Sequence, residues 1–358
     1  MQDIEVAIVG TGWCGGIRAE ACARYPGVRA LHIAETRPER LAEMARLTRP
    51  ASATADYREL LANPAIAAVF VCATPETLHY PIAREALGAG KHVFLEKPIA
   101  IELWEADDLI AIARKKNLKF TIGYSQRFNP KYAYLKKCID DGTLGKPISA
   151  LVSRHLSRSL GNKITGRGKL SPAAMESTHD LDFVLWCLEP AKPVRVYSQS
   201  VLRVRHETQP GTPDIQWTLV TMDDGTTITV GGAWIMPPGH PNFSHTWIEF
   251  LGSEGSLVID DTHRDVALNV MKGGVTFPMS TMPGEPVGHV FAGPMTTETL
   301  QFVDAVLRDG PVLVTPEQAR LVMEVYTAAD LSAELNEPIS LPLQGARPAA
   351  APPRQSAG

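Results

Sequence analysis

Residues 4–15 read Ile4-Glu5-Val6-Ala7-Ile8-Val9-Gly10-Thr11-Gly12-Trp13-Cys14-Gly15. A short apolar run that ends in glycine is typical of a buried parallel strand, and a helical pattern follows at 16–25. The spacing Gly-x-Gly-x-x-Gly indicates a tight turn whose backbone approaches the pyrophosphate of a dinucleotide at the start of a helix. Gly10, Gly12 and Gly15 are therefore predicted to bind a dinucleotide cofactor.

An acidic residue follows at the position that contacts the adenosine ribose in folds with such a turn. Glu35 ends the second apolar run, 20 positions beyond Gly15. A carboxylate there accepts hydrogen bonds from the ribose hydroxyls and repels a 2′-phosphate, so NAD is predicted in preference to NADP. Arg37 offers a partner for that phosphate, which keeps NADP as the less favoured alternative. The competing interpretation is a glycine-rich turn followed by a solvated glutamate.

Strands and helices alternate over residues 1–122. The apolar patterns predict strands at 4–9, 28–34, 67–72, 92–95 and 119–122, and helices at 16–25, 38–47, 75–89 and 103–113. Alternation with short connections predicts a doubly wound parallel sheet. We therefore expect residues 1–122 to form an NAD(P)-binding domain of the Rossmann type.

The pattern changes after Gly123. Helices are predicted at 131–140, 178–187, 296–308 and 316–336, and strand-like segments at 194–205, 215–222, 226–234, 246–251 and 256–260. This predicts a second α/β domain over 123–342, built on a large, mostly antiparallel open sheet with helices on one face. The other face is predicted to form a subunit contact. Residues 343–358 are rich in Pro, Ala, Gly, Arg and Ser and are expected to form a disordered tail.

Composition excludes several classes of function. The 358 residues carry a net charge of −4 without a block of Lys or Arg, so no nucleic-acid partner is predicted. The five cysteines are scattered without a Cys-x-x-Cys pair, which predicts a reducing compartment and no metal site. We find no signal-type leader and no apolar run of the ~20 residues that a membrane helix needs. The chain is therefore expected to be a soluble protein of the cytoplasm.

A lysine stands at the carboxyl end of the fourth predicted strand. Glu96-Lys97-Pro98 follows the run 92–95. Ligands of such sheets bind at the carboxyl ends of the strands, and a lysine there can stabilise a developing alkoxide and relay a proton. The plain alternative is a surface lysine in a strand-to-helix loop. As a hypothesis, the Lys97–Pro98 peptide bond is cis and directs the lysine side chain.

At these motifs the chain resembles the glucose–fructose oxidoreductase / inositol dehydrogenase / rhizopine-catabolism family of NAD(P)-dependent dehydrogenases. The resemblance covers residues 1–342 and rests on the glycine turn, Ala-Glu-x-x-Pro-Glu-Arg at 34–40, Thr74-Pro75 with His79, Glu-Lys-Pro at 96–98, Gly-Tyr-Ser-Gln-Arg-Phe at 123–128 and Thr-His-Asp-Leu-Asp at 178–182. It implies a Rossmann domain followed by an α/β domain with an open sheet. It also implies oxidation or reduction of one carbon of a sugar, cyclitol or related polyol, by homodimers or homotetramers formed through that sheet.

The resemblance also implies roles for individual residues. Lys97 matches the family's catalytic lysine and His179 its general acid/base, for which an imidazole is suited. Many members carry an aspartate four residues before this histidine; here that position is Met175, and Glu176 is one residue off. The cofactor contacts implied are Thr74, Pro75, His79, Glu96 and Lys97, beside the glycine turn and Glu35. Trp13 has two interpretations, a cover over the nicotinamide or a cap on the seam between the domains.

Substrate contacts are implied for residues that begin the second domain or follow the histidine, namely Tyr124, Arg127, Arg154, His155 and Asp180. For Arg127 a structural salt bridge is an equal alternative. Because a strand alternates its faces, only one of Arg154 and His155 can point into the cleft. Pocket size is expected to depend on the loops 156–170 and 235–244, the first of which carries Arg158, Lys163, Arg167 and Lys169.

The function predicted from these residues is NAD-dependent oxidation of a secondary hydroxyl of a sugar, glycoside or cyclitol by hydride transfer to nicotinamide. Two alternatives belong to other classes. One is an NAD-retaining enzyme that cleaves a glycoside after transient oxidation of the sugar. The other is a non-catalytic NAD(P)-sensing regulator, against which the presence of both Lys97 and His179 argues.

Overall fold

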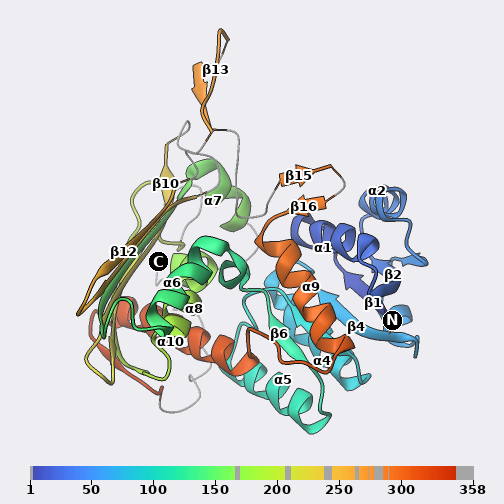
Figure 1. The fold of residues 1–358 in the computed structure, drawn as a ribbon, viewed down its shortest axis with the longest axis horizontal. Coiled ribbons are helices and arrows are strands. Elements are labelled where there is room, and N and C mark those ends of the chain that lie inside the picture. The colour runs from blue at the N-terminus through green and yellow to red at the C-terminus, as the bar shows by residue number, and fades with distance from the viewer. Residues whose placement is uncertain are drawn as a thin grey trace, which may run out of the picture.

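The computed structural model describes residues 3–165, 170–205, 211–237, 244–262, 266–272, 274–277, 285–288 and 290–343. Figure 1 shows two units side by side, a helix-covered sheet that carries the N-terminus and a broader sheet with helices on its inner face. Within the described ranges, no helix is long and apolar enough to cross a membrane. The tail from 344 onward and the loop residues Arg167 and Lys169 lie outside the described residues.

The first unit is a six-stranded parallel sheet in the order β3-β2-β1-β4-β5-β6. Its strands are β1 (Ile4–Val9), β2 (Val28–Ala34), β3 (Ser52–Thr54), β4 (Ile66–Val71), β5 (His92–Leu95) and β6 (Phe120–Ile122). Its helices are α1 (Trp13–Arg24), α2 (Pro38–Thr48), α3 (Tyr57–Leu61), α4 (His79–Gly88) and α5 (Leu103–Lys115), with a 3₁₀ turn η1 (Glu76–Leu78). The predicted doubly wound parallel sheet is confirmed. The short β3 and α3 were not predicted, because elements of three and five residues are too short to show a periodic apolar pattern.

The order of the strands reverses between β2-β1 and β4-β5, which defines a switch point between β1 and β4. In open α/β sheets, ligands bind outside the carboxyl ends of the strands at this point. The glycine turn follows β1, and the loop with Thr74 and Pro75 follows β4. The topology therefore brings these two predicted cofactor segments together.

The second unit is a seven-stranded sheet in the order β12-β11-β7-β10-β9-β8-β17. Its strands are β7 (Pro147–Ser157), β8 (Pro193–Val201), β9 (Ile215–Met222), β10 (Thr227–Met236), β11 (His245–Gly252), β12 (Ser256–Asp261) and β17 (Ile339–Ser340). Only β7 and β10 pair in parallel, so the sheet is mixed but mostly antiparallel, as predicted. Its helices are α6 (Pro130–Asp140), α7 (Arg158–Thr165), α8 (Thr178–Leu188) and α10 (Pro316–Leu335), with turns η2 (Ser125–Phe128) and η3 (Ala173–Ser177).

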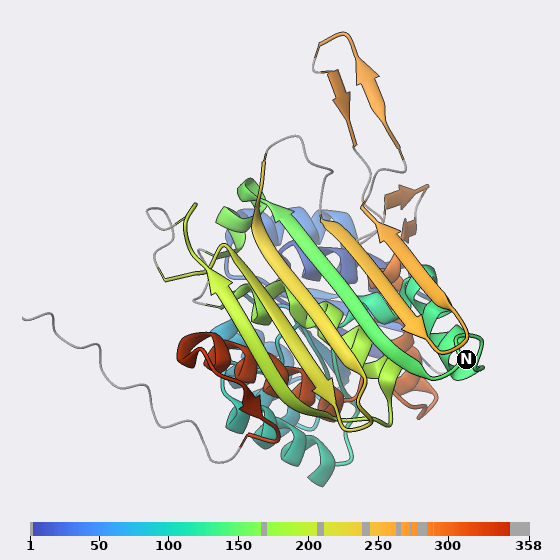
Figure 2. The same ribbon diagram turned by 90° about the vertical axis from the view of Figure 1, so that its left-hand side faces the viewer.

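The two faces of this sheet differ. Helices α8 and α10 cover one face, whereas Figure 2 shows the other face of the broad sheet turned toward the viewer and not covered by helices. Residues alternate between buried and exposed along the strands because successive side chains point to opposite faces. The uncovered face carries exposed apolar side chains, which are Leu151, Trp217, Leu219, Leu251 and Val258. Two small hairpins follow β12 in the chain. One, β13 (Leu268–Val270) with β14 (Gly274–Thr276), extends away from the second sheet, and the other, β15 (Glu285–Val287) with β16 (Val290–Ala292), lies beside α1 of the first unit.

One late helix returns to the first unit. Helix α9 (Pro294–Leu307) packs against α1, although the sequence predicted it as part of the second domain. Its Phe302 packs edge-on against the stacked rings of Phe70 and Phe94 of the first sheet, with its ring centroid 5.3 and 5.8 Å from theirs. The periodicity of a helix reports which face is apolar, but it does not report the partner against which that face packs.

Candidate functional site

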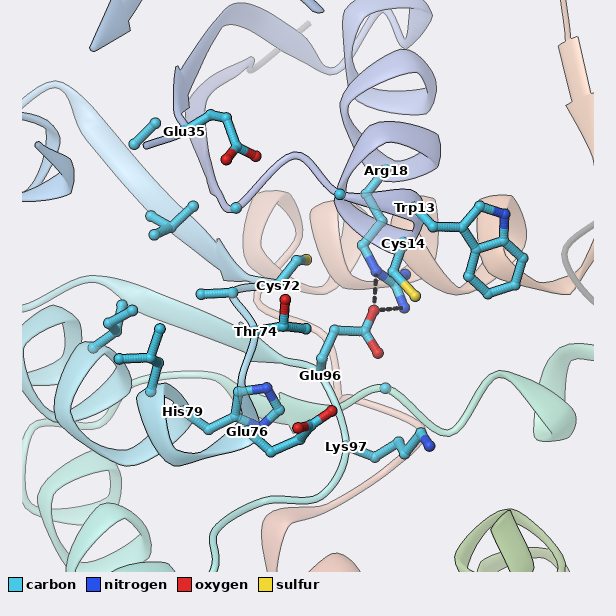
Figure 3. A pocket seen from close by; sticks show the side chains of 18 of the residues that line it. Trp13, Cys14, Arg18, Glu35, Cys72, Thr74, Glu76, His79, Glu96 and Lys97 are labelled. Carbon is cyan, nitrogen blue, oxygen red and sulfur yellow. Dashed lines mark hydrogen bonds and ion pairs between the residues drawn. The ribbon is translucent and has the colours of Figure 1, made fainter. Parts of the chain in front are cut away.

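A pocket of about 910 Å³ lies at the switch point and extends to the second unit. This is near the upper end of the roughly 300–1,000 Å³ usual for sites of small ligands and cofactors. Of the predicted site residues, it is lined by Gly10, Gly12, Trp13, Glu35, Thr74, His79, Glu96, Lys97, Arg154 and His179. The pocket wall does not include Gly15, Pro75, Tyr124, Arg127, His155 or Asp180. Figure 3 shows the part of this pocket formed by the first unit.

A side chain at each of the three glycines of the turn would meet different surroundings. Gly10 has φ +83°, and a Cβ there would lie 2.7 Å from Cα of Ala73 in the neighbouring loop. A Cβ at Gly15 would lie 1.9 Å from the Gly10 carbonyl oxygen, so Gly15 permits helix α1 to begin directly on the turn. A Cβ at Gly12 would meet nothing within 4 Å, because this residue borders the pocket. The backbone at Gly12 and the positive end of α1 thus fit a pyrophosphate.

Glu35 is held ionised beside this turn. Its carboxylate accepts hydrogen bonds from the backbone N–H of Thr11 (2.9 Å) and from the Thr11 hydroxyl (3.0 Å). Nε of Arg37 donates a third bond at 3.0 Å. Burial by itself would raise the pKa of Glu35, but the bonds from Arg37 and Thr11 outweigh it and lower the pKa to about 2. Arg37, which is 62% exposed, is therefore engaged with Glu35.

The loop after β4 is tied to the loop after β5. The Thr74–Pro75 peptide bond is cis, and Thr74 borders the pocket. Buried His79 places Nδ1 2.7 Å from the carbonyl oxygen of Pro98, with the imidazole as donor. Burial lowers the pKa of His79, so its ring is neutral near pH 7. His79 thus borders the pocket and also connects the two loops that carry Thr74 and Lys97.

Lys97 reaches from the first unit to the second. The Lys97–Pro98 peptide bond is cis, which confirms the hypothesis made from the sequence. Nζ donates a hydrogen bond of 2.6 Å to the carbonyl oxygen of Met175, in the turn before α8. Figure 3 shows the lysine extending from the strand end on the same side of the pocket as Glu76 and Glu96. The lysine is therefore a pocket residue and not the solvated surface lysine of the alternative interpretation.

His179 lies in the first turn of α8 and borders the same pocket. It is 9% exposed, and its Nδ1 has no hydrogen-bond partner among the described residues. Burial, with the positive charges of Lys97 and Arg154, lowers the pKa of His179 well below 6.5. The Tyr124 ring packs edge-on against the imidazole at 6.0 Å between centroids, and its hydroxyl is 2.8 Å from Oγ1 of Thr178. The imidazole of His179 is thus neutral near pH 7 and is packed against Tyr124.

Two of the residues implied as substrate contacts form a buried ion pair with each other. Arg154 donates from Nε and Nη2 to the two carboxylate oxygens of Asp180, at 2.8 and 2.7 Å. Arg154 borders the pocket, whereas Asp180 lies behind it. His155 lies on the opposite face of the sheet, where it packs against Trp217 and His245. The alternation expected for this strand is confirmed, with Arg154 as the residue that faces the pocket.

Arg127 lies away from the pocket in a buried network. Its Nε and Nη2 donate to the two oxygens of Asp182 at 2.8 and 2.6 Å, and Nη1 donates to the Leu313 carbonyl and the Gln318 side chain. Both side chains of the ion pair are almost fully buried. This placement favours the structural salt bridge, and no substrate contact is proposed for Arg127.

Replacing Arg127 by alanine is therefore expected to destabilise the fold, because the Asp182 carboxylate would stay buried without its cation. Breaking such a pair from one side costs about 3–5 kcal/mol of unfolding free energy. Thermal and urea unfolding measure this loss. The paired variant R127M/D182L, which removes both charges, should recover most of it. Unchanged unfolding together with a raised KM would instead place Arg127 at the substrate.

Sequence reasoning missed a second buried charge network. Arg18 of α1 donates from Nε to Glu96 at 2.8 Å and from Nη2 to Glu298 of α9 at 2.8 Å. Burial raises the pKa of Glu298 to about 8, although Arg18 opposes this shift. Figure 3 shows the bonds between Arg18 and Glu96. No local pattern signals these contacts, because the partners lie 78 and 280 positions from Arg18.

Trp13 begins helix α1 on the side of the pocket that carries Cys14 and Arg18, with its ring extended away from Glu35 and Thr74 (Figure 3). Its side chain is 54% exposed.

Glu76 and Glu176 also border the pocket, and neither was assigned a role from the sequence. Within the described ranges, no group of three His, Cys, Asp or Glu side chains is arranged to hold a metal ion.

The fold and the pocket define a two-domain protein that fits a nicotinamide dinucleotide between a Rossmann domain and an open-sheet domain. Comparison with known families agrees. Residues 4–124 match the oxidoreductase family with an NAD-binding Rossmann fold, and residues 136–341 match its C-terminal alpha/beta domain. The chain therefore belongs to the glucose–fructose oxidoreductase / inositol dehydrogenase / rhizopine-catabolism family of oxidoreductases.

Individual relatives are distant but cover most of the chain. The NAD⁺-dependent scyllo-inositol 2-dehydrogenase of Bacillus subtilis is 26% identical over 349 residues, which cover 96% of this chain and 98% of the relative. The levoglucosan dehydrogenase of Pseudarthrobacter phenanthrenivorans is 29% identical over 299 residues, covering 74% and 75%. The structure of scyllo-inositol dehydrogenase from Lactobacillus casei, with bound NAD(H) and scyllo-inositol, superposes with a TM-score of 0.81 at 23% identity, covering 95% and 99%.

Proposed function

We propose that this protein is an NAD-dependent dehydrogenase that oxidises a secondary hydroxyl of a sugar, glycoside or cyclitol. The observation that carries the proposal is the meeting of Lys97, from the first unit, and His179, from the second, in one pocket with the glycine turn and Glu35. The inositol and levoglucosan dehydrogenases among its relatives support the substrate class.

The residues of the pocket fit NAD, which when bound supplies the acceptor for a hydride. Gly10, Gly12 and the start of α1 would hold its pyrophosphate, and Glu35 the adenosine ribose. Thr74, His79 and Glu96 border the remaining cofactor region. The removal of a hydride from the alcohol carbon is balanced by loss of the hydroxyl proton, leaving a carbonyl.

His179 receives that proton in the proposed reaction. Its depressed pKa keeps it neutral, as a general base must be. Lys97 stabilises the negative charge that develops on the alcohol oxygen as the O–H bond breaks. Its bond to the Met175 carbonyl orients the ammonium group toward the domain boundary.

The test of the proposed function is NAD⁺ reduction, followed at 340 nm, against inositols, levoglucosan, free sugars, sugar acids and glycosides. Turnover of neutral polyols with stoichiometric NADH supports the proposal. Glycoside cleavage without net NADH would favour the cofactor-retaining hydrolase, and tight NAD binding without turnover would favour the sensor.

A homodimer or homotetramer through the apolar open face is also proposed, and a monomeric mass in solution would contradict it. Location in the cytoplasm stays a prediction.

Replacing Glu35 by serine is expected to weaken NAD binding by about 10- to 100-fold, because a charged partner of the ribose hydroxyls is lost. The same change should improve NADP use, since the carboxylate that repels a 2′-phosphate is gone. Dissociation constants for both cofactors measure the effect. Arg37→Ala is the matched control, because it keeps the carboxylate and should keep the preference for NAD. An unchanged NAD-to-NADP ratio in E35S would contradict the assignment.

A further inference from the structure

One carboxylate in the pocket wall has no part in the reaction proposed above. Glu176 comes from the π-helical turn η3, directly before α8. It is 6% exposed and borders the pocket together with Lys97, Arg154 and His179. An ionised carboxylate is costly to bury unless its oxygens are hydrogen-bonded, so the burial of Glu176 beside the pocket needs a physical explanation.

The two oxygens of Glu176 have different surroundings. Oε1 accepts a hydrogen bond of 3.3 Å from Nε1 of the fully buried Trp234. No side chain of the described residues donates a hydrogen bond to Oε2, and Glu176 lines the pocket. The two nearby cations are engaged elsewhere, since Lys97 donates to the Met175 carbonyl and Arg154 pairs with Asp180. Burial raises the pKa of Glu176, while Lys97, Arg154 and the Trp234 bond act in the opposite direction.

The turn that carries Glu176 is held rigidly from behind. A Cβ at Gly232 of β10 would lie 2.5 Å from Oγ of Ser177 and 3.1 Å from the Pro172 carbonyl oxygen, so only glycine allows the turn to lie this close to the sheet. The side chain of Gln216 accepts a hydrogen bond from the N–H of Ala173. Single π-helical turns occur frequently at functional sites. Here the turn presents the Met175 carbonyl to Lys97 and the Glu176 carboxylate to the pocket.

We propose that Glu176 is a specificity-determining residue whose free oxygen accepts a hydrogen bond from a second hydroxyl of the substrate, beside the one that is oxidised. This inference rests on the proposed function and narrows its substrate class to neutral polyols with neighbouring hydroxyls. A hydroxyl donor satisfies this pocket-lining oxygen, whereas a bound substrate without a donor there would displace water from it and leave it unpaired. A substrate that places its own carboxylate or phosphate there is rejected by like charge.

The experiment compares Glu176→Gln with the native protein on scyllo-inositol, myo-inositol, levoglucosan and glucuronate. The amide retains an acceptor for Trp234 but presents a neutral group to the substrate. The KM for the best neutral polyol is expected to rise by about 10- to 100-fold, with kcat and the dissociation constant for NAD nearly unchanged. Discrimination against glucuronate should weaken. Glu254→Gln, at an exposed glutamate in the turn between β11 and β12, is the matched control.

Two results overturn the inference: a KM for neutral polyols equal to that of the native protein, or a loss of kcat with unchanged KM. If Glu176→Gln fails to fold, Glu176→Asp replaces it, since the shorter side chain withdraws the oxygen and should raise KM by a smaller factor. An unchanged KM in that variant also overturns the inference.

Failure of the proposed function gives a different result. If the native protein oxidises none of these compounds, thermal shifts of its NADH complex with the same polyols are measured. Stabilisation that is lost in Glu176→Gln supports recognition by Glu176 even though oxidation has failed. Absence of stabilisation in the native protein overturns the inference together with the proposed function.

Discussion

Lys97→Ala is expected to lower kcat for alcohol oxidation by about 10²- to 10⁴-fold, while NAD affinity stays within about twofold of the native value. The ammonium group lies at the boundary where the strand end of the first unit meets the π-helical turn, and it donates to the Met175 carbonyl at 2.6 Å. Its removal deprives the developing alkoxide of a partner. The pyrophosphate and ribose contacts that we propose for the glycine turn and Glu35 are unchanged in this variant.

Stopped-flow measurement of NADH formation and calorimetric titration of NAD together test this expectation. Lys115→Ala, at an exposed lysine in the last turn of α5, is the matched control and should behave like the native protein. Lys97→Arg keeps a charge but not the compact ammonium, so it should recover only part of the activity. If Lys97→Ala retained most of its turnover, the lysine would have no role in the chemical step.

His179→Ala is expected to lower kcat by about 10²- to 10⁴-fold and to change the pH dependence as well. In the native protein, burial and the cations Lys97 and Arg154 depress the pKa of this imidazole well below 6.5. A base must be unprotonated, so kcat/KM should stay level as the pH falls from 8 to about 6.5. It should then decline as the pH falls through the depressed pKa.

The pH profile of kcat/KM at saturating NAD is the measurement, since it reports the groups that titrate before the substrate binds. The acidic limb of the profile should disappear in His179→Ala. Tyr124→Phe, which removes only the hydroxyl that bonds Thr178, should preserve the limb and shift it slightly. A variant at position 179 with the native acidic limb would show that another group is the base.

Local patterns predicted the parts of this protein that depend on local interactions. The apolar runs at 4–9, 28–34, 67–72 and 92–95 became parallel strands, because continuous apolar runs suit strands covered on both faces. The glycine spacing could be recognised because a tight turn and a close backbone approach leave no room for Cβ atoms. The same reasoning located Lys97 at a strand end, where the structure shows it bordering the pocket.

The pairing of the buried arginines with their carboxylate partners could not be predicted from local sequence patterns. The sequence analysis implied substrate contacts for Arg127 and Arg154 and assigned no role to Arg18, whereas the structure pairs each of the three with a different carboxylate. Such partners are chosen by the packing of elements that lie far apart in the chain, and one-dimensional spacing carries no information about them. Helix α9 returns to the first unit for the same reason.

The chain's own residue order was enough to predict the parallel Rossmann sheet, the mostly antiparallel second sheet and the glycine turn, since strand periodicity and turn chemistry are local. The role of His179 was implied by the family resemblance, and the catalytic roles of Lys97 and His179 stay predictions. Only the tertiary structure shows that Arg154, and not His155, faces the pocket and that Arg127 lies away from it. Packing also brought Glu176 into the pocket wall through a π-helical turn pressed against Gly232. The burial of these side chains and the distances between them are fixed only when the two sheets and their helices pack together.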